Sequence, residues 1–407
     1  MWENLLDTVG LAVRDEARAF VRDVPVELVR DMDADKIRFP REYVRGLGSR
    51  NLLGLRFPRE VGGRGLPWTV EMAVLEEIGV LGTALGCAFA MPSIVGEALS
   101  RFGTPQQQER WLRPMLRGEK VAAEALTEPR GGSDFFGATT TARPHGGGFV
   151  LDGAKRFVVG AEGADFFLVY AKTDPKAPRH KSLGLFLVDR DAGVKVEHLY
   201  GLLGTRGGGT GRIVFKGVCV PHENLVGQLD QGGEIFNRMM VPERLTSAGG
   251  ALGAARAALD IATRYSAKRK AFGKVIREFQ AVSFRLAGAV ARLDAARGLA
   301  YAACRAADGP ADPRRLVSEA KKFCTETAWD AVNVAMQTMG GIGYTSVYPV
   351  ERLLRDVRLM TIWTGTNDVM DLLIQHEWYR EVLERAADSR DVERDVPPGG
   401  DDEKDFG

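Results

Sequence analysis

The sequence predicts an α+β fold that is mostly α: an N-terminal helical domain, a central antiparallel β-barrel-like domain and a C-terminal four-helix bundle. The prediction rests on two changes in the period of the apolar residues. The period is helical over residues 1–120, strand-like over 121–232 and helical again over 233–385. Residues 386–407 are charged and rich in Pro and Gly, so we expect a disordered tail there.

Helical spacing is visible at both ends of the chain. Near the N-terminus apolar residues recur every four positions, and residues 67–116 contain several further apolar faces. In the C-terminal region two stripes have the length that the helices of a bundle need. The three stripes are Leu5, Val9, Val13 and Ala17; Leu252, Ala255, Leu259 and Ala262; and Val282, Leu286, Val290 and Leu293.

The central region contains short apolar runs, such as GFVLDG, DFFLVYAKT and LGLFLVD, each bounded by Gly, Asp or Pro. These spacings are typical of a small antiparallel sheet or barrel. No helix-length pattern separates the runs. The sequence therefore argues against a βαβ dinucleotide-binding fold in this region.

Bulk composition argues against several classes of function. The 407 residues carry 55 basic and 54 acidic side chains, so nothing points to nucleic acid or an anionic membrane as partner. No apolar stretch reaches the roughly 18 residues of a membrane span. Acidic residues near the start argue against a secretion signal. We expect a soluble, cytoplasmic protein.

Cysteine and histidine are dispersed along the chain. The four cysteines form no CxxC pair, and we expect buried, reduced thiols. The five histidines form no HxxxH or HExxH motif, so the sequence predicts no metal site. These residues are Cys87, Cys219, Cys304 and Cys324, and His145, His180, His198, His222 and His376.

Two Gly-rich motifs are candidates for ligand contacts. GTRGGGTGR at 204–212 lacks the GK[ST] ending of a phosphate loop and precedes a strand, so we interpret it as a turn. ALTEPRGGSD at 125–134 combines the hydroxyls of Thr127 and Ser133 with two glycines that let backbone amides approach a ligand. Taken alone, this second motif is equally compatible with a polar turn.

Together with KRFVVGAEGAD and LGTRGGGTGRIVFKGVCVPHENLVG, the second motif resembles the central β domain of the acyl-CoA dehydrogenase family. ERLTSAGGALGAARAALDIATRYSAKRKAFGKVIREFQ and AMQTMGGIGYTSVYPVERLLRDVRLMTIWTGTNDV resemble its C-terminal segments, and FPREYVRGLGSRNLLGLRFPREVGGRGL fits its N-terminal domain. The resemblance covers about residues 40–377. It implies FAD as cofactor, an acyl-CoA substrate, an electron-transfer flavoprotein as electron acceptor and a homo-oligomer, usually a tetramer.

The resemblance also implies the residues that contact FAD. One group lies against the flavin and its pyrophosphate, where amides and hydroxyls stabilise negative charge on the ring. Others grip the FAD of a neighbouring subunit, form a Gly-rich turn on the adenosine side, or close over the cofactor. In that order they are Leu126, Thr127, Gly132, Ser133, Phe157 and Val159; Arg269, Phe272 and Gln280; Gln337, Gly340 and Gly341; and Thr366 and Asp368.

Phe157 and Val159 depart from the family, which commonly has Trp and Thr in a pattern like KxWIT. Phe157 keeps an aromatic face. Val159 has no hydroxyl to offer the reactive flavin nitrogen. We expect altered flavin potential or reactivity, with FAD binding retained.

The catalytic base is a further departure. Most family members carry a Glu directly before the Gly-Thr of the closing segment, where this chain has Thr364. A branch typified by isovaleryl-CoA and long-chain acyl-CoA dehydrogenases carries the Glu on the helix that begins the C-terminal domain, which corresponds to Glu243. We expect Pro242 in the first turn of that helix and Glu243 to take the α-proton of the thioester. The other interpretation of Glu243 is a solvated acid at a helix N-terminus.

The substrate-binding candidates are Ser133, Arg244, Thr364 and Gly365, with helix packing as the other role for Arg244. Ala84 stands where the glutaryl-CoA branch has an Arg that holds a carboxylate, so we expect a neutral acyl group: aliphatic, branched or alicyclic. Three methionines are candidates for a pliable pocket wall or for plain core, namely Met91, Met239 and Met240.

Two other functions stay open. A flavoenzyme on the same scaffold with different chemistry, such as an oxidase, a lyase, a monooxygenase or a dehydrogenase of carrier-protein thioesters, would explain Val159 and the absent usual Glu. A non-catalytic subunit of a mixed oligomer is the other. Arg269, Gln280 and the 337–341 turn argue against it.

Overall fold

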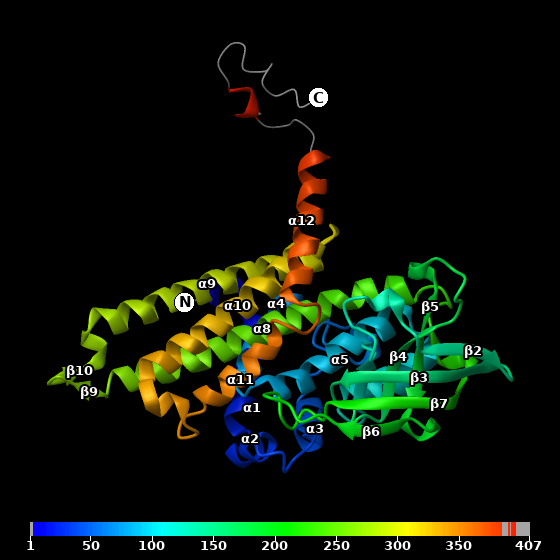
Figure 1. Ribbon diagram of the computed structural model, residues 1–407, viewed down its shortest axis with the longest axis horizontal. Helices are drawn as coiled ribbons and strands as arrows, with labels where there is room; N and C mark the ends of the chain where they lie inside the picture. The colour runs from blue at the N-terminus through cyan, green and yellow to red at the C-terminus, as the bar shows by residue number, and fades with distance from the viewer. Residues whose placement is uncertain (1–2, 385–389, 391, 396–407) are drawn as a thin grey trace.

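A computed structural model describes residues 3–384, 390 and 392–395 of the chain. Helices, a sheet and more helices follow one another along the chain, as the sequence predicts, and the sheet lies at one end of the longest axis (Figure 1). The domain boundaries stay a prediction. Apart from residues 390 and 392–395, the predicted tail lies outside the described residues.

The N-terminal helices begin where caps and prolines favour them. The Asp7 carboxylate accepts a 2.7 Å hydrogen bond from the Gly10 amide at the start of the first long helix. Val9 is exposed, contrary to the predicted stripe, whereas Val13 and Ala17 are buried. The helices are α1 (Thr8–Asp23), α2 (Val26–Asp33), α3 (Arg41–Ser49), α4 (Trp68–Gly79), α5 (Thr83–Phe102), α6 (Pro105–Gln107) and α7 (Arg113–Leu116).

The eight-stranded sheet follows the order β6-β7-β3-β2-β4-β5-β8, with β1 paired to β4. Most pairs are antiparallel, but β1–β4 and β2–β4 are parallel, so the sheet is mixed rather than wholly antiparallel. Its strands are β1 (Ala122–Ala125), β2 (Thr141–His145), β3 (Gly148–Val158), β4 (Phe166–Lys172), β5 (Leu183–Asp189), β6 (Lys195–Leu199), β7 (Gly211–Pro221) and β8 (Leu225–Val226).

The central strands β4 and β5 are buried on both faces. Side chains on one face, including Leu168 and Tyr170, pack with helix residues such as Trp111 and Met239. Residues of the other face, such as Val169, form a separate core within the sheet domain. This explains the nearly continuous apolar runs, because strict alternation is expected only where one face meets water.

The C-terminal helices pack around α10, which contacts α8, α9, α11 and α12. The predicted stripe on α8 is fully buried, whereas Val290 on α9 is exposed and its neighbour Ala289 is buried instead. The elements are α8 (Gly232–Ser266), α9 (Gln280–Asp308), α10 (Arg314–Met339), α11 (Val350–Met360) and α12 (Asn367–Leu383), with a small hairpin of β9 (Lys270–Ala271) and β10 (Lys274–Val275).

The start of α8 corrects the sequence prediction. The helix begins at Gly232, so Pro242 lies inside it rather than in its first turn, and Glu243 is not a first-turn acid. A proline inside a helix removes one backbone hydrogen bond. The contacts of α8 with α4, α5, α9, α10 and α11 hold it as one helix through that position.

Close packing of α8 against α4 depends on glycine. A Cβ at Gly253 would meet the Glu76 carbonyl oxygen at 2.4 Å, and a Cβ at Gly79 would meet the Gly250 carbonyl oxygen at 2.6 Å. Both are shorter than van der Waals contact. Glycines at these positions therefore let the two backbones approach, which brings the N-terminal domain onto the helix that carries Glu243.

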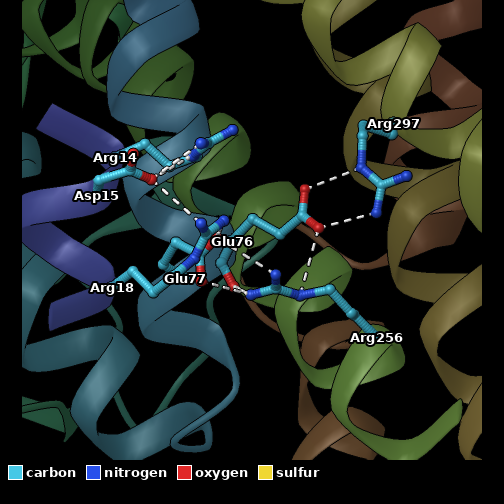
Figure 2. A network of polar contacts seen from close by, with 7 residues as sticks. All are labelled: Arg14, Asp15, Arg18, Glu76, Glu77, Arg256 and Arg297. Carbon is cyan, nitrogen blue, oxygen red and sulfur yellow. Dashed lines mark hydrogen bonds and ion pairs between the residues drawn. The ribbon is translucent and has the colours of Figure 1, made fainter. Parts of the chain in front are cut away.

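A network of ion pairs links α1, α4, α8 and α9 across the same junction (Figure 2). Arg297 donates two hydrogen bonds to the buried Glu76 carboxylate, at 2.8 and 2.9 Å. Glu77 binds both Arg18 and Arg256. Such pairs fix orientation, because a buried carboxylate without its partner would carry a large desolvation cost.

Helix α5 has the length and apolarity of a membrane span, which the sequence analysis did not predict, but 78% of its apolar 18-residue stretch is buried inside the fold. We interpret it as a core helix. Its face toward the sheet forms one wall of the pocket described below.

Candidate active site

The ALTEPRGGSD loop follows β1 and is anchored by Glu128. The buried Glu128 carboxylate accepts hydrogen bonds from Lys155 Nζ at 2.9 Å and from the backbone amides of Thr139 and Thr140. Burial alone would raise the pKa of Glu128, but the Lys155 ammonium and these donors lower it to about 2. Glu128 is therefore a structural anion that fixes the loop on β3.

The predicted flavin-contacting residues of this loop are held by backbone hydrogen bonds near Glu128 at one end, and they reach the surface at the other end. The Leu126 carbonyl accepts from Lys155 Nζ at 3.1 Å, and the Thr127 carbonyl accepts from the Arg156 amide at 2.8 Å. Gly132 is packed near the Thr127 side chain, whereas Ser133 is exposed. The loop is held firmly while its far end stays open to a ligand.

Phe157 and Val159 lie where β3 ends. Phe157 has a left-handed backbone conformation, with φ 56°, and its half-exposed ring contacts Tyr200. Left-handed backbone is uncommon for aromatic residues, so the packing of the strand end imposes it. The Arg156 guanidinium carbon lies over the ring, 4.9 Å from its centroid, and about half of the Phe157 surface stays exposed.

Val159 lines a pocket with an empty volume of about 380 Å³. Ala84, Cys87, Ala88 and Met91 from α5 form one wall. All four are uncharged, and the pocket continues to Gly160 and Gly208 beside the end of β3. Met91 is thus a pocket residue, whereas Met239 and Met240 are buried elsewhere in the core.

Glu243 lies on the face of α8 that packs against the sheet. It follows the buried Ile235 and Met239 at intervals of four residues, so the three side chains share one face. The carboxyl groups of Glu243 and of Glu124 on β1 influence each other's pKa, so the two side chains are neighbours. Glu243 therefore faces the sheet and is partly buried.

Burial raises the pKa of both carboxyl groups in this pair. The pKa of Glu124 is raised well above its usual range by burial and then by the charge of Glu243. For Glu243, burial raises the pKa, while the neighbouring Glu124 side chain and the charge of Arg244 act in the opposite direction.

The segment from Trp363 to Gly365 lies against the same part of α8. Trp363 Nε1 donates a 2.7 Å hydrogen bond to Ser247 Oγ. Lys321 Nζ on α10 donates to the Gly365 carbonyl at 2.8 Å. Thr364 has φ 53°, and among the described residues its buried Oγ1 finds no hydrogen-bond partner.

Arg244 packs inside the bundle. Its guanidinium donates to Ser318 Oγ on α10 at 3.3 Å, and burial lowers its pKa to about 10. This placement supports the helix-packing role.

The GTRGGGTGR motif connects β6 to β7, as its interpretation as a turn predicts. The buried Asp356 carboxylate of α11 accepts from the Thr205 amide at 2.7 Å and from the Thr83 amide at 3.0 Å. The motif is thereby tied to the start of α5. Gly208 then forms part of the pocket wall.

Arg269, Phe272 and Gln280 lie far from the sheet. Arg269 immediately precedes the β9–β10 hairpin, Phe272 is in its turn with 94% of its surface exposed, and Gln280 begins α9. The hairpin is at the opposite end of the longest axis from the sheet (Figure 1). Helix α8 contacts β5 and ends just before the hairpin, and its 35 residues span about 50 Å, so one bound flavin ring cannot reach both groups within a single chain.

The turn at the end of α10 is exposed and contains Gln337, Gly340 and Gly341. It lies close to that hairpin, because Tyr348, shortly after the turn, contacts Tyr265 near the end of α8. Thr366 is the N-cap of α12, where its hydroxyl accepts from the Val369 amide. Asp368 is exposed in the first turn of α12.

Sequence reasoning missed Glu124 and Tyr170 as neighbours of Glu243, and Lys155 as a neighbour of Glu124. A signal for Glu124 was present: a single acid within the short apolar run VAAEAL. Cys219 is exposed, contrary to the expectation of four buried thiols, and all four cysteines are free. Across the described residues, no cluster of three or more potential metal ligands is found.

Family models for the N-terminal, middle and C-terminal domains of acyl-CoA dehydrogenases match residues 10–119, 123–218 and 230–378. The chain is 36% identical to the 3-(aryl)acrylate reductase of Clostridium sporogenes, covering 89% of this chain and 96% of the relative. It is 33% identical to the caffeyl-CoA reductase-Etf complex subunit CarC of Acetobacterium woodii, with 89% and 96% covered.

Solved structures agree. Butyryl-CoA dehydrogenase from Megasphaera elsdenii superposes with a TM-score of 0.89 at 29% identity, covering 92% of this chain and 99% of the other. The FAD complex of PigA superposes with a TM-score of 0.86 at 26% identity, with 92% and 98% covered.

Proposed function

This chain belongs to the acyl-CoA dehydrogenase family of FAD-dependent oxidoreductases, and we propose that it converts an acyl-CoA to its 2-enoyl-CoA with Glu243 as the base. The observation that carries this proposal is the inward placement of Glu243 on α8, where burial raises its pKa. Thr364, at the family's other base position, has no acidic group.

The residues present fit FAD. Phe157 offers a half-exposed aromatic ring, the Leu126–Ser133 loop is anchored with its end open, and Thr364 has a buried hydroxyl without a partner in the described chain. When bound, FAD accepts the hydride that leaves the β-carbon. We propose that the loop, Phe157 and Val159 hold its flavin half.

The other half of the predicted cofactor set suggests an oligomer. Arg269, Phe272 and Gln280 lie at the opposite end of the molecule from the sheet. Because Phe272 is 94% exposed, we propose that these residues and the 337–341 turn contact the FAD of a neighbouring subunit in a homotetramer.

Glu243 would remove the α-proton by general-base catalysis. The Cα–H bond breaks, its proton joins the Glu243 carboxylate, and its electron pair forms the new double bond as the β-hydride departs. A raised pKa makes the ionised carboxyl a stronger base than an exposed glutamate. Glu243 must be ionised for the step, so activity should rise as pH rises through its pKa.

The α5 wall supports a neutral acyl group. On α5, Ala84, Cys87, Ala88 and Met91 present no charge that would hold a second carboxylate, and the cation among the pocket's lining residues is Lys120, just before β1. Ionised Glu243 near the site would in addition repel one. We propose an aliphatic, branched or alicyclic acyl-CoA, and an electron-transfer flavoprotein as acceptor, since a relative is a subunit of an Etf complex.

Two relatives are named as reductases, which favours the reverse direction as a second candidate: reduction of a 2-enoyl thioester by the same residues.

The absence of a hydroxyl at Val159 is the observation that favours altered flavin chemistry, including oxidase, lyase, monooxygenase or carrier-protein dehydrogenase activity. The cytoplasmic location stays a prediction.

Anaerobic titration of the purified protein with a panel of acyl-CoAs tests the proposal. We expect the flavin absorbance to bleach and the product to be two mass units lighter. Glu243→Gln should keep FAD and lose bleaching, whereas Glu234→Gln, at an exposed site near the start of α8, should match wild type. Bleaching of Glu243→Gln within tenfold of wild type excludes Glu243 as base. Peroxide formed stoichiometrically with oxygen as sole acceptor favours an oxidase.

A further inference from the structure

Glu124 faces the helices rather than the interior of the sheet domain. On β1, Ala123 and Ala125 belong to the sheet-domain core, while Ala122 belongs to the core shared with the helices. Side chains alternate along a strand, so Glu124 points with Ala122. The parallel pairing of β1 with β4 sets Glu124 opposite Leu168, another residue of the shared core.

The facing helix presents Glu243 at the same place. Tyr170, two residues beyond Leu168 on the same face of β4, donates its hydroxyl hydrogen to Met239 Sδ at 3.0 Å. Glu243 is one turn beyond Met239 on α8. The alternation of side chains along β1 and the helical period of α8 thus independently direct Glu124 and Glu243 toward each other.

We propose that Glu124 and Glu243 share one proton as a carboxyl pair, in which neutral Glu124 donates to ionised Glu243 and positions it as the base. The inference rests on the proposed role of Glu243. Two carboxyl groups directed at one partly buried place favour a shared proton, because two ionised carboxylates side by side would repel each other.

The surroundings leave Glu124 as the protonated member. Its Oε1 is buried and has no other partner among the described residues. Lys155, the nearest cation on β3, is already bound to Glu128 and to the Leu126 carbonyl. Arg244, in contrast, stabilises the ionised form of Glu243.

The other titratable groups facing the pair stay neutral. Burial raises the pKa of the Tyr170 hydroxyl on β4, and the charges of Glu124 and Glu243 raise it further. Burial and the charge of Glu243 likewise raise the pKa of the Cys87 thiol on α5. The pair therefore carries one negative charge at neutral pH, on Glu243, which becomes neutral once the α-proton is taken.

Anaerobic bleaching by an active acyl-CoA tests the positioning role. Glu124→Gln keeps a neutral hydrogen-bond donor and should bleach within about threefold of wild type. Glu124→Leu has no donor and should slow bleaching by about 10²-fold, with FAD still bound, because a base misplaced by about 1 Å loses that much. The inference is overturned if Glu124→Leu is as fast as wild type, or if Glu124→Gln is as inactive as Glu243→Gln, which would make Glu124 itself the base.

A second measurement needs no substrate. Groups whose pKa is higher in the folded protein than in the unfolded chain stabilise the fold at low pH, and this stability is lost as pH rises through the folded pKa. The Tm of wild type should therefore fall more steeply than that of Glu124→Gln as pH rises from about 5 to 8. If Tm falls equally steeply with pH in wild type and in Glu124→Gln, the proposal of a shared proton is wrong. If no acyl-CoA bleaches wild type, the proposed function fails while this test of the pair still stands.

Discussion

Trp363 Nε1 donates a 2.7 Å hydrogen bond to Ser247 Oγ, and Ser247 lies one helical turn beyond Glu243 on α8. The turn that carries Thr364 is thereby docked beside the helix that carries the proposed base. Two backbone positions from distant parts of the chain thus border one site, and a carboxylate at either could reach the same substrate carbon.

This geometry predicts that the base can be moved. In a Glu243→Gln background, Thr364→Glu should restore anaerobic bleaching by at least tenfold, because it supplies a carboxylate from the second position. Thr364→Gln in the same background is the matched control and should restore nothing. A folded, FAD-bound double variant that stays as inactive as Glu243→Gln would show that the two positions do not converge.

Val159 should be a determinant of flavin potential. Val159→Thr replaces a methyl group with a hydroxyl of nearly the same size. One further hydrogen bond from this hydroxyl to the reduced flavin ring stabilises the reduced state by about 1 kcal/mol. For a two-electron couple this corresponds to a midpoint potential about 20 mV more positive. A redox titration with Val159→Ala as control checks the effect. Equal potentials in both variants would place the side chain away from the flavin.

The α4–α8 contact should tolerate no side chain at Gly253. Gly253→Ala places a Cβ 2.4 Å from the Glu76 carbonyl oxygen and should lower the free energy of unfolding by about 1–3 kcal/mol. Gly298→Ala, on α9 with nothing within 4 Å, should raise it by up to about 1 kcal/mol through helix propensity. Urea unfolding of both variants measures the difference, and equal effects would contradict the packing argument.

Lys321 should make stability depend on pH. Its Nζ donates to the Gly365 carbonyl and to Asn367 Oδ1, and burial, followed by the charge of Arg244, lowers its pKa to about 7. Above pH 7 the Lys321 side chain therefore binds more protons in the unfolded chain than in the folded protein. For this reason the free energy of unfolding rises as pH increases toward the pKa of Lys321 in the unfolded chain.

Thermal unfolding from pH 7 to 9.5 tests this contribution. The Tm of Lys321→Met should lack the increase with pH that the Tm of wild type shows. Lys322→Met, which removes a partly exposed ion pair with Asp371, should retain it. If Lys321→Met follows the wild-type pH dependence, Lys321 is charged in the folded protein.

The order of helices and strands was predictable from the sequence because hydrophobic period is a local property. Stripes such as Leu252 to Ala262 are buried as expected. The start of α8 was predicted wrongly, since a proline is common in a first turn, whereas tertiary contacts here carry the helix through Pro242. The parallel pairing of β1 with β4 was also missed, because its partners are about forty residues apart.

By itself the sequence determined the family, the cofactor and the candidacy of Glu243, because these depend on residue types at set spacings along the chain. Only the tertiary structure decided that Glu243 faces inward, that Glu124 lies opposite it, and that the two groups of predicted FAD residues lie at opposite ends of the subunit. The physical reason is that the strand carrying Glu124 and the helix carrying Glu243 are about 120 residues apart, and their meeting is set by packing of the shared core.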